Sequence, residues 1–217
     1  MQKLAILNQA LLKIGVSKTI ISLTENTREA YTLGLLYDPS LREVLRSYPW
    51  AFATKYADST TAASGDAMEL FAGTSTVPVN GDWQYAYRYP EDCLLARRLV
   101  NAATGRRYDA NPIPFRVGRD VEGEDDTVVQ LIYTNQVDAV LEYTALVVMG
   151  DTFADPLFED CLSWFIGSKA APSLSRDDKM AQRCLVMADV TFQRGTAVSA
   201  REAQLEPPGQ AEWISGR

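Results

Sequence analysis

The fold is decided by residues 26–50, which read NTREAYTLGLLYDPSLREVLRSYPW. Apolar side chains recur here at alternating spacings of three and four residues, which predicts an amphipathic helix with one face in a core. Thr24 or Asn26 is the expected N-cap, and Glu29 completes a capping box with Asn26. The predicted buried face consists of Ala30, Leu33, Gly34, Tyr37, Leu41, Val44, Leu45 and Tyr48.

Two prolines shape this helix. Pro39 removes one backbone donor and crowds the carbonyl of Leu35. Because the apolar face keeps its phase across Pro39, we expect one kinked helix and not two. Pro49 ends the helix, since the residue before a proline is disfavoured in helical conformation.

Three more helices are predicted on the same grounds. The first carries Leu4, Leu7, Leu11 and Ile14 and stops at Gly15. Another begins after Asp155 as cap with Pro156 in its first turn, and ends near Pro172. The last is capped by Ser175 with Asp178 at the third position. The inner faces of these last two helices are predicted to hold Phe158, Cys161, Leu162, Phe165 and Ile166, and then Ala181, Cys184, Leu185, Ala188 and Phe192.

Between Trp50 and about Val147 the helical period disappears and short β-rich runs are separated by turn-forming residues. Alternation from Trp83 to Tyr89 predicts a strand that packs Trp83, Tyr85, Tyr87 and Tyr89 on one side; a stacking platform for a sugar or base is the alternative. Residues 128–133 and 139–147 are expected to form a hairpin through Thr134-Asn135-Gln136. Thr104-Gly105 reads as another tight turn, and residues 58–82 as a mobile loop or insertion.

The predicted fold class is therefore α+β and mainly α. We expect a four-helix bundle-like body with a β-rich insertion between the second and third helices, and an extended C-terminal arm. In residue numbers this is a single domain, 1–203, with helical parts 1–49 and 151–203, a β-rich part 50–150, and an arm 204–217.

Composition narrows the function classes. The 217 residues are 47% hydrophobic and 23% charged, which indicates a globular protein. The net charge of −7 argues against binding nucleic acid through a broad basic face. No histidine is present, which excludes His-dependent triads and general bases. The Walker, GxGxxG and GxSxG patterns are also absent, and the three cysteines have no metal-ligand spacing, so no cofactor or metal is expected.

Three groups of residues are candidates for contacts. The acidic cluster Glu122, Glu124, Asp125 and Asp126 could bind a hard cation or serve a glycosidase, but a solvated turn is favoured. The pairs Arg97-Arg98 and Arg106-Arg107 flank a predicted turn and are candidates for a subunit interface; solubilising charge on a hairpin and contact with DNA are the alternatives. The C-terminal arm, with Leu205, Pro207, Pro208, Trp213 and Ile214, is expected to dock on a partner, the alternative being a frayed terminus.

Several short motifs follow one another along most of the chain: residues 7–15 (LNQALLKIG), 21–30 (ISLTENTREA), 36–39 (LYDP), 45–53 (LRSYPWAFA), 87–94 (YRYPEDCL) and 155–160 (DPLFED). In their order and spacing the chain resembles the tail tubular protein A and head-to-tail adaptor family of short-tailed phages. A tyrosine, Tyr48, stands before Pro49-Trp50 where family members often carry histidine.

The resemblance implies a non-enzymatic subunit of a homo-oligomeric ring, a dodecamer, between the portal protein and the tail. It also implies that the C-terminal segment reaches the portal and that the β-rich part faces a tail nozzle or tail tubular protein B-like component. Double-stranded DNA would pass through without sequence readout. The resemblance also implies a location in the virion tail or neck. Synthesis in a cytoplasm is expected, because the start of the chain lacks a signal-peptide core and no run is long enough to span a membrane.

Two alternatives remain at this point. One is an adaptor with an added glycan or peptidoglycan hydrolase activity, for which Glu91, Asp92, Glu124 and Asp126 are the candidate carboxylates. The other is a soluble binding module of a host.

Overall fold

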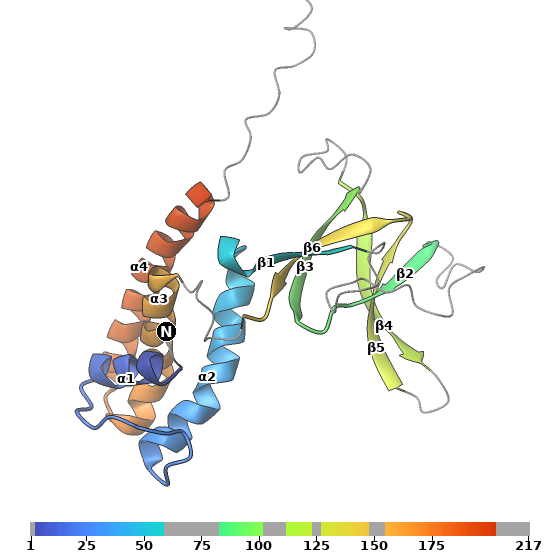
Figure 1. Cartoon of the computed structure of the whole chain (residues 1–217). Helices are drawn as coiled ribbons and strands as arrows, with labels where there is room; N and C mark the ends of the chain where they lie inside the picture. Colours follow the sequence, from blue (N-terminus) through green and yellow to red (C-terminus); the bar gives the residue numbers. More distant parts are fainter. Residues whose placement is uncertain (1–2, 59–82, 102–111, 123–126, 148–154, 203–217) are drawn as a thin grey trace, which may run out of the picture. The chain divides into compact units, whose positions relative to one another are not determined.

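The computed structural model describes residues 3–58, 83–101, 112–122, 127–147 and 155–202. These residues form a mixed helix-and-sheet protein in which contacts cluster into two compact units (Figure 1). The helical unit contains the described residues of 3–53 and 146–202, and the strand unit those of 54–145.

The described part of the helical unit holds four α-helices and one short 3-10 helix. Helix α3 contacts each of the other three helices. Its sequence is apolar almost all round, as expected for a helix surrounded by protein, and it buries Phe158, Leu162 and Ile166 completely. The elements are α1 (Lys3–Lys13), α2 (Arg28–Ser47), η1 (Ala51–Ala53), α3 (Pro156–Leu174) and α4 (Asp178–Glu202).

Helix α2 runs unbroken through Pro39, as predicted, but its N-cap prediction was wrong. The cap is Thr27, whose hydroxyl oxygen accepts the Ala30 N–H at 3.2 Å. Glu25 accepts the N–H groups of Ile21 and Ser22 at 2.7 and 2.9 Å, which closes a turn just before the helix. That turn satisfies the backbone upstream and moves the first helical residue to Arg28.

At the other end of the chain, Asp155 caps α3 as predicted and accepts the Leu157 N–H at 2.8 Å. The prediction for Ser175 was wrong: it is the C-cap of α3, and its N–H donates to the Ala171 carbonyl at 3.0 Å. Asp177 accepts the N–H groups at the start of α4 instead. Leu185 was expected to be buried but is 44% exposed, because the buried side of α4 runs through Cys184, Ala188 and Thr191.

Trp50 is the centre of the helical core. It is fully buried, its indole N–H donates to the Val44 carbonyl at 3.0 Å, and its ring meets Phe158 and Phe192 edge-on. Edge-to-face aromatic pairs of this kind add to the free energy gained from burial alone. The junction after Pro49 is therefore packed into the helical unit.

The described residues of the strand unit form two three-stranded antiparallel sheets, ordered β1-β6-β3 and β2-β5-β4. The sheets share one apolar cluster, to which Leu99 and Leu141 contribute from the first sheet and Tyr87 and Ile132 from the second. Because both sheets bury side chains in this cluster, it is the core of the described part of the strand unit. The strands are β1 (Thr54–Asp58), β2 (Tyr85–Arg88), β3 (Cys93–Asn101), β4 (Phe115–Glu122), β5 (Thr127–Thr134) and β6 (Ala139–Ala145).

The predicted hairpin through Thr134-Asn135-Gln136 was wrong, because β5 and β6 lie in different sheets. Asn135 accepts the Gln84 N–H at 2.9 Å, and Asp138 adopts a φ of 53°. This segment therefore carries the chain from one sheet to the other. Strand β5 pairs instead with β4, from Glu122↔Thr127 onward.

The aromatic stripe was predicted correctly for three of its four members. Tyr85, Tyr87 and Tyr89 pack against the cluster shared by the sheets, and Tyr87 is only 1% exposed, which leaves its ring no face for stacking a base. Trp83 packs against a second cluster that contains Ala86. Strand β2 begins only at Tyr85, so the alternation does not extend back to Trp83.

Several sequence predictions fall outside the described residues, and the pair Arg106-Arg107 is one of them. The others are the turn at Thr104-Gly105, most of the 58–82 segment, the acidic residues Glu124, Asp125 and Asp126, and the arm 204–217.

Candidate interaction surfaces

One flank of α4 combines cationic and apolar side chains. Arg183, Arg194 and Arg201 are exposed, and none forms a salt bridge within the described part of the chain. Met187, Val190 and Val198 fall between them at spacings of three and four residues, so all six lie along one side of the helix. From Arg183 to Arg201 this side is about 27 Å long at 1.5 Å per residue.

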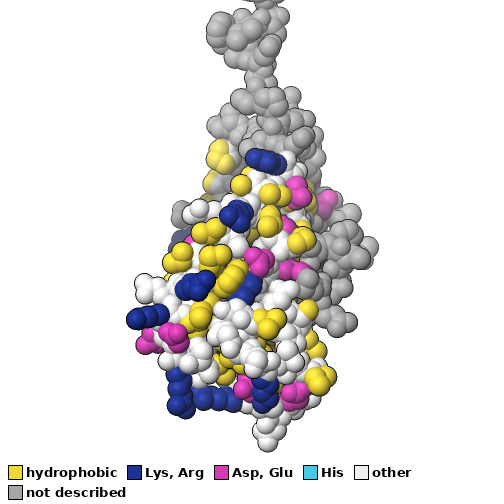
Figure 2. Space-filling view, turned by 90° about the vertical axis from the view of Figure 1, so that its left-hand side faces the viewer, with side chains coloured by type: hydrophobic (Ala, Val, Ile, Leu, Met, Phe, Trp, Pro, Cys, Tyr) yellow, Lys and Arg dark blue, Asp and Glu magenta, His cyan; other side chains and the backbone are white. Residues whose placement is uncertain are grey.

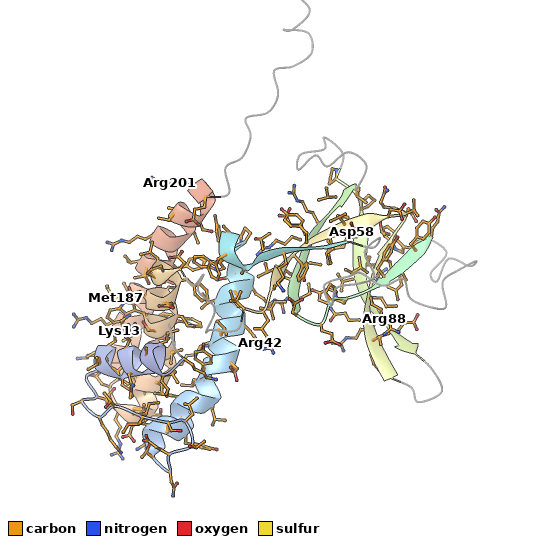
Figure 3. All side chains as sticks on the ribbon, viewed as in Figure 1. Lys13, Arg42, Asp58, Arg88, Met187 and Arg201 are labelled. Atoms are coloured by element: carbon orange, nitrogen blue, oxygen red, sulfur yellow. The ribbon has the colours of Figure 1, made fainter. Side chains whose placement is uncertain are left out.

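We call these six residues the cationic flank. Val198 is 38% exposed, and Met187 and Val190 are half-buried. The view of the helical unit in Figure 2 shows Lys and Arg side chains interspersed with hydrophobic and acidic ones. Figure 3 marks Met187 and Arg201 on α4. In a chain of net charge −7, a helix side with three such cations is a local reversal of sign.

A groove lies where α4 faces α2 across α3. Its volume is about 170 Å³, and its floor is apolar, with Phe165, Phe192 and Cys161. Glu43 from α2 and Asp189 from α4 line it as well. Glu43 pairs with Lys169 at 2.6 Å and keeps 59% of its side chain exposed, whereas Asp189 has no salt bridge in the described residues. We call this feature the acid-lined groove.

The thiol of Cys161 takes no part in chemistry at this groove. It donates to the Ala188 carbonyl at 3.6 Å, and burial raises its pKa to about 11. A thiol rather than a thiolate is present at neutral pH, and a thiol is a weak nucleophile. Cys161 therefore packs as a small apolar residue, as predicted.

A second hollow, of about 230 Å³, lies beside Tyr37. Lys3, Asp38 and Arg42 supply its polar lining, with the Lys3 ammonium 4.1 Å from the centre of the Tyr37 ring. The Tyr37 hydroxyl is buried and has no hydrogen-bond partner among the described residues. Burial raises the pKa of Tyr37 to about 12, so the phenol stays neutral at physiological pH.

Lys13 and Ser163 have the atom types of a Ser–Lys catalytic pair. Lys13 Nζ lies 2.5 Å from Ser163 Oγ and 2.5 Å from Asp160 Oδ1, and it sits 4.3 Å from the Trp164 ring centre. Ser163 is completely buried, so no substrate carbonyl can reach its oxygen. These contacts hold α1 against α3, so we assign a structural role to Lys13 and Ser163.

The predicted arginine candidates are only partly described. Arg98 pairs with Glu142 at 2.5 Å, and Arg97 Nε donates to Thr144 Oγ1 at 2.6 Å, which ties β3 to β6. Both side chains therefore stabilise the pairing of β3 with β6 in the first sheet. Arg106 and Arg107 lie outside the described residues, as do the arm residues Leu205, Pro207, Pro208, Trp213 and Ile214.

Of the carboxylates considered for hydrolysis, Asp92 is engaged at both oxygens. It accepts the Tyr143 hydroxyl at 2.9 Å and binds Lys55 Nζ at 2.9 Å. Glu91 is exposed at the start of the turn that precedes β3. A pair of carboxylates facing each other across a bond, as glycoside hydrolysis requires, is not formed by these two residues.

Within the described ranges there is no group of three His, Cys, Asp or Glu side chains placed to hold a metal ion. The helices that the structure describes also include none long and apolar enough to cross a bilayer.

No protein-family model matches this chain, and neither does any curated protein sequence.

Sequence reasoning missed both the flank and the groove. It used the three–four period of α4 only to find the inner face, although Met187, Val190, Arg194 and Val198 repeat the same spacing on another side. The groove had no local signal, because its lining comes from three helices that are far apart in the sequence.

Proposed function

We propose that this protein is a structural head-to-tail adaptor subunit of a short-tailed phage. Copies of the chain would form a ring, of twelve in the family it resembles, between the portal and the tail, through which double-stranded DNA passes. In finer terms, α1 to α4 would be a four-helix body, and the strand unit an insertion between α2 and α3 that faces the next tail component.

The observation that supports the proposal is that residues of the motifs named above form structural contacts in the fold. Asn8, in the first motif, exchanges two hydrogen bonds with the backbone of Ile20 at 2.8 and 2.9 Å. Glu25 closes the turn before α2, and Trp50 is the centre of the helical core. Asp155 caps α3. Each of these residues positions a helix or the connection to one.

The fifth motif behaves in the same way in the strand unit, where Asp92 links Tyr143 and Lys55. In these motifs the polar residues form hydrogen bonds and ion pairs within the fold. Such motifs are typical of a structural protein, which acts through its surfaces and not through a catalytic site. Fold alone does not determine function, so the proposal rests on these residues and on their order in the chain.

The direct test is native mass spectrometry of the purified protein, alone and mixed with the portal protein encoded beside it. We expect a defined multiple of subunits to appear on the portal, and that multiple counts the ring. A protein that remains free of the portal at micromolar concentration would remove the proposal.

The C-terminal arm is the proposed portal contact, and a chain truncated after Ala203 tests it. We expect the truncated chain to bind the portal more weakly, with the helical circular dichroism unchanged. Substituting Trp213→Ala and Ile214→Ala together in the full chain is the matched test of the anchor itself. Portal binding at the wild-type level in both variants would contradict the assignment of Leu205, Pro207, Pro208, Trp213 and Ile214 as a docking arm.

A further inference from the structure

From the two surfaces of the helical unit we infer that copies of this chain contact each other head to tail, with the cationic flank of α4 seated in the acid-lined groove of the next copy. This inference rests on the proposed function, because it names the contact that would close the ring. The partner is a second copy of this chain.

The positions of the two surfaces favour a repeating contact. Phe192 and Asp189 line the groove from one side of α4, and Val190 and Arg194 belong to the flank on another side. At 100° per residue, the flank and the groove-lining residues of α4 are separated by roughly half a turn. A surface and its complement on different sides of one subunit produce a head-to-tail series, which forms a ring when the rotation closes.

The surfaces also match in chemistry. The flank presents Arg183, Arg194 and Arg201, and the groove presents Asp189 and the half-exposed Glu43 against one cation, Lys169. Met187 and Val190 lie between the arginines at the spacing with which one helix packs into the groove beside another. The groove floor of Phe165 and Phe192 is apolar and suits them. Apolar contact with a charged rim is the usual composition of a specific interface.

Charge complementarity between copies fits the sign of the whole chain. With 28 acidic and 21 basic residues, two copies of the chain carry the same net negative charge, so they repel each other in most relative orientations. Contact at the cationic flank removes that repulsion locally and selects one orientation. Other large apolar side chains of the helical unit are also exposed, and we assign them no partner: Leu12, Ile21, Tyr31, Leu35, Leu185 and Val186.

Charge reversal tests the contact in the full chain. Arg194→Glu places an acid against Asp189 of the next copy, and Asp189→Arg places a cation against Arg194. We expect each single variant to lower ring assembly on the portal by about tenfold or more, because like charges meet at the contact. The double variant R194E/D189R restores opposite charges between neighbouring copies and should recover most of the assembly.

Arg119→Glu is the matched control, since Arg119 is an exposed arginine of β4 without a salt bridge in the described residues. It lowers the net charge by about two units, as Arg194→Glu does, and should assemble as the wild type does. Circular dichroism and thermal unfolding of each variant separate loss of assembly from loss of folding.

The outcomes are distinguishable. Rescue by the double variant supports the contact. Wild-type assembly by folded single variants, or failure of the double variant to recover when both singles are impaired, overturns the contact while a ring on the portal still stands. No assembly by the wild-type chain, with or without the portal, overturns the proposed function and this inference together.

Discussion

Replacing Gly195 by alanine probes how closely α4 packs on the core tryptophan. A Cβ at position 195 would lie 3.1 Å from Cζ3 and 3.2 Å from Cη2 of Trp50, and 3.6 Å from Leu157 Cβ. Carbon atoms pack best at about 3.5–4.0 Å, so the indole would have to move by a few tenths of an ångström. Its hydrogen bond to Val44 and its contacts with Phe158 and Phe192 oppose that movement.

Gly34→Ala is the matched control, because a Cβ at position 34 of α2 meets only Leu23 Cδ2, at 3.9 Å. Both positions are inside helices, so each replacement gains about 0.5–1 kcal/mol from the lower backbone entropy of the unfolded chain. Overpacking costs about 1–3 kcal/mol and applies only at position 195. We therefore expect G34A to stabilise the protein, and G195A to be less stable than G34A by about 1–3 kcal/mol.

The assay is urea denaturation followed by far-ultraviolet circular dichroism, in which the helical unit dominates the signal. Its transition is fitted separately from that of the strand unit, because two units need not unfold together. Trp50→Phe in the G195A background offers a smaller ring, so the cost of the alanine should shrink there. Equal stability of G195A and G34A would refute the close packing of α4 on Trp50.

Two further predictions concern a cap and a titration. Thr27→Ala removes the hydroxyl that accepts the Ala30 N–H, so we expect the free energy of unfolding to fall by about 1 kcal/mol, and Asn26→Ala to change it by less than about 0.5. Equal losses in chemical denaturation would argue against Thr27 as the cap. Burial raises the pKa of Tyr37 from 10.0 to about 12, so its contribution to stability is complete below pH 10 and lost between pH 10 and 12. Ultraviolet titration should lose a late tyrosinate step in Tyr37→Phe, and an unchanged titration would contradict this assignment.

The helices could be predicted because their signals are local. A three–four apolar period needs no knowledge of the partner surface, and Asp155-Pro156 marks a helix start by its own chemistry. The caps at Thr27 and Asp177 were missed because several neighbouring side chains can cap a helix equally well. The surrounding turn, here the one closed by Glu25, decides among them.

Strand pairing was predicted less well. Short separation suggested that β5 and β6 form a hairpin, yet each finds its partners in a different sheet. Burying Ile132 and Leu141 in one cluster shared by the sheets lowers the free energy of the folded state, and this contribution cannot be read from the local sequence. For the same reason the alternation around Tyr87 could not show that Trp83 lies before the strand and packs elsewhere.

Residue pattern was enough to predict four amphipathic or apolar helices around a β-rich middle, because side-chain period and turn chemistry act between near neighbours. Tertiary packing was needed to show that α3 contacts the three other helices and that Glu43, Phe165 and Asp189 line one groove. It also decided that Arg183, Arg194 and Arg201 remain without salt bridges in the described residues. These outcomes depend on contacts between residues far apart in the chain, whose free energies no local pattern records.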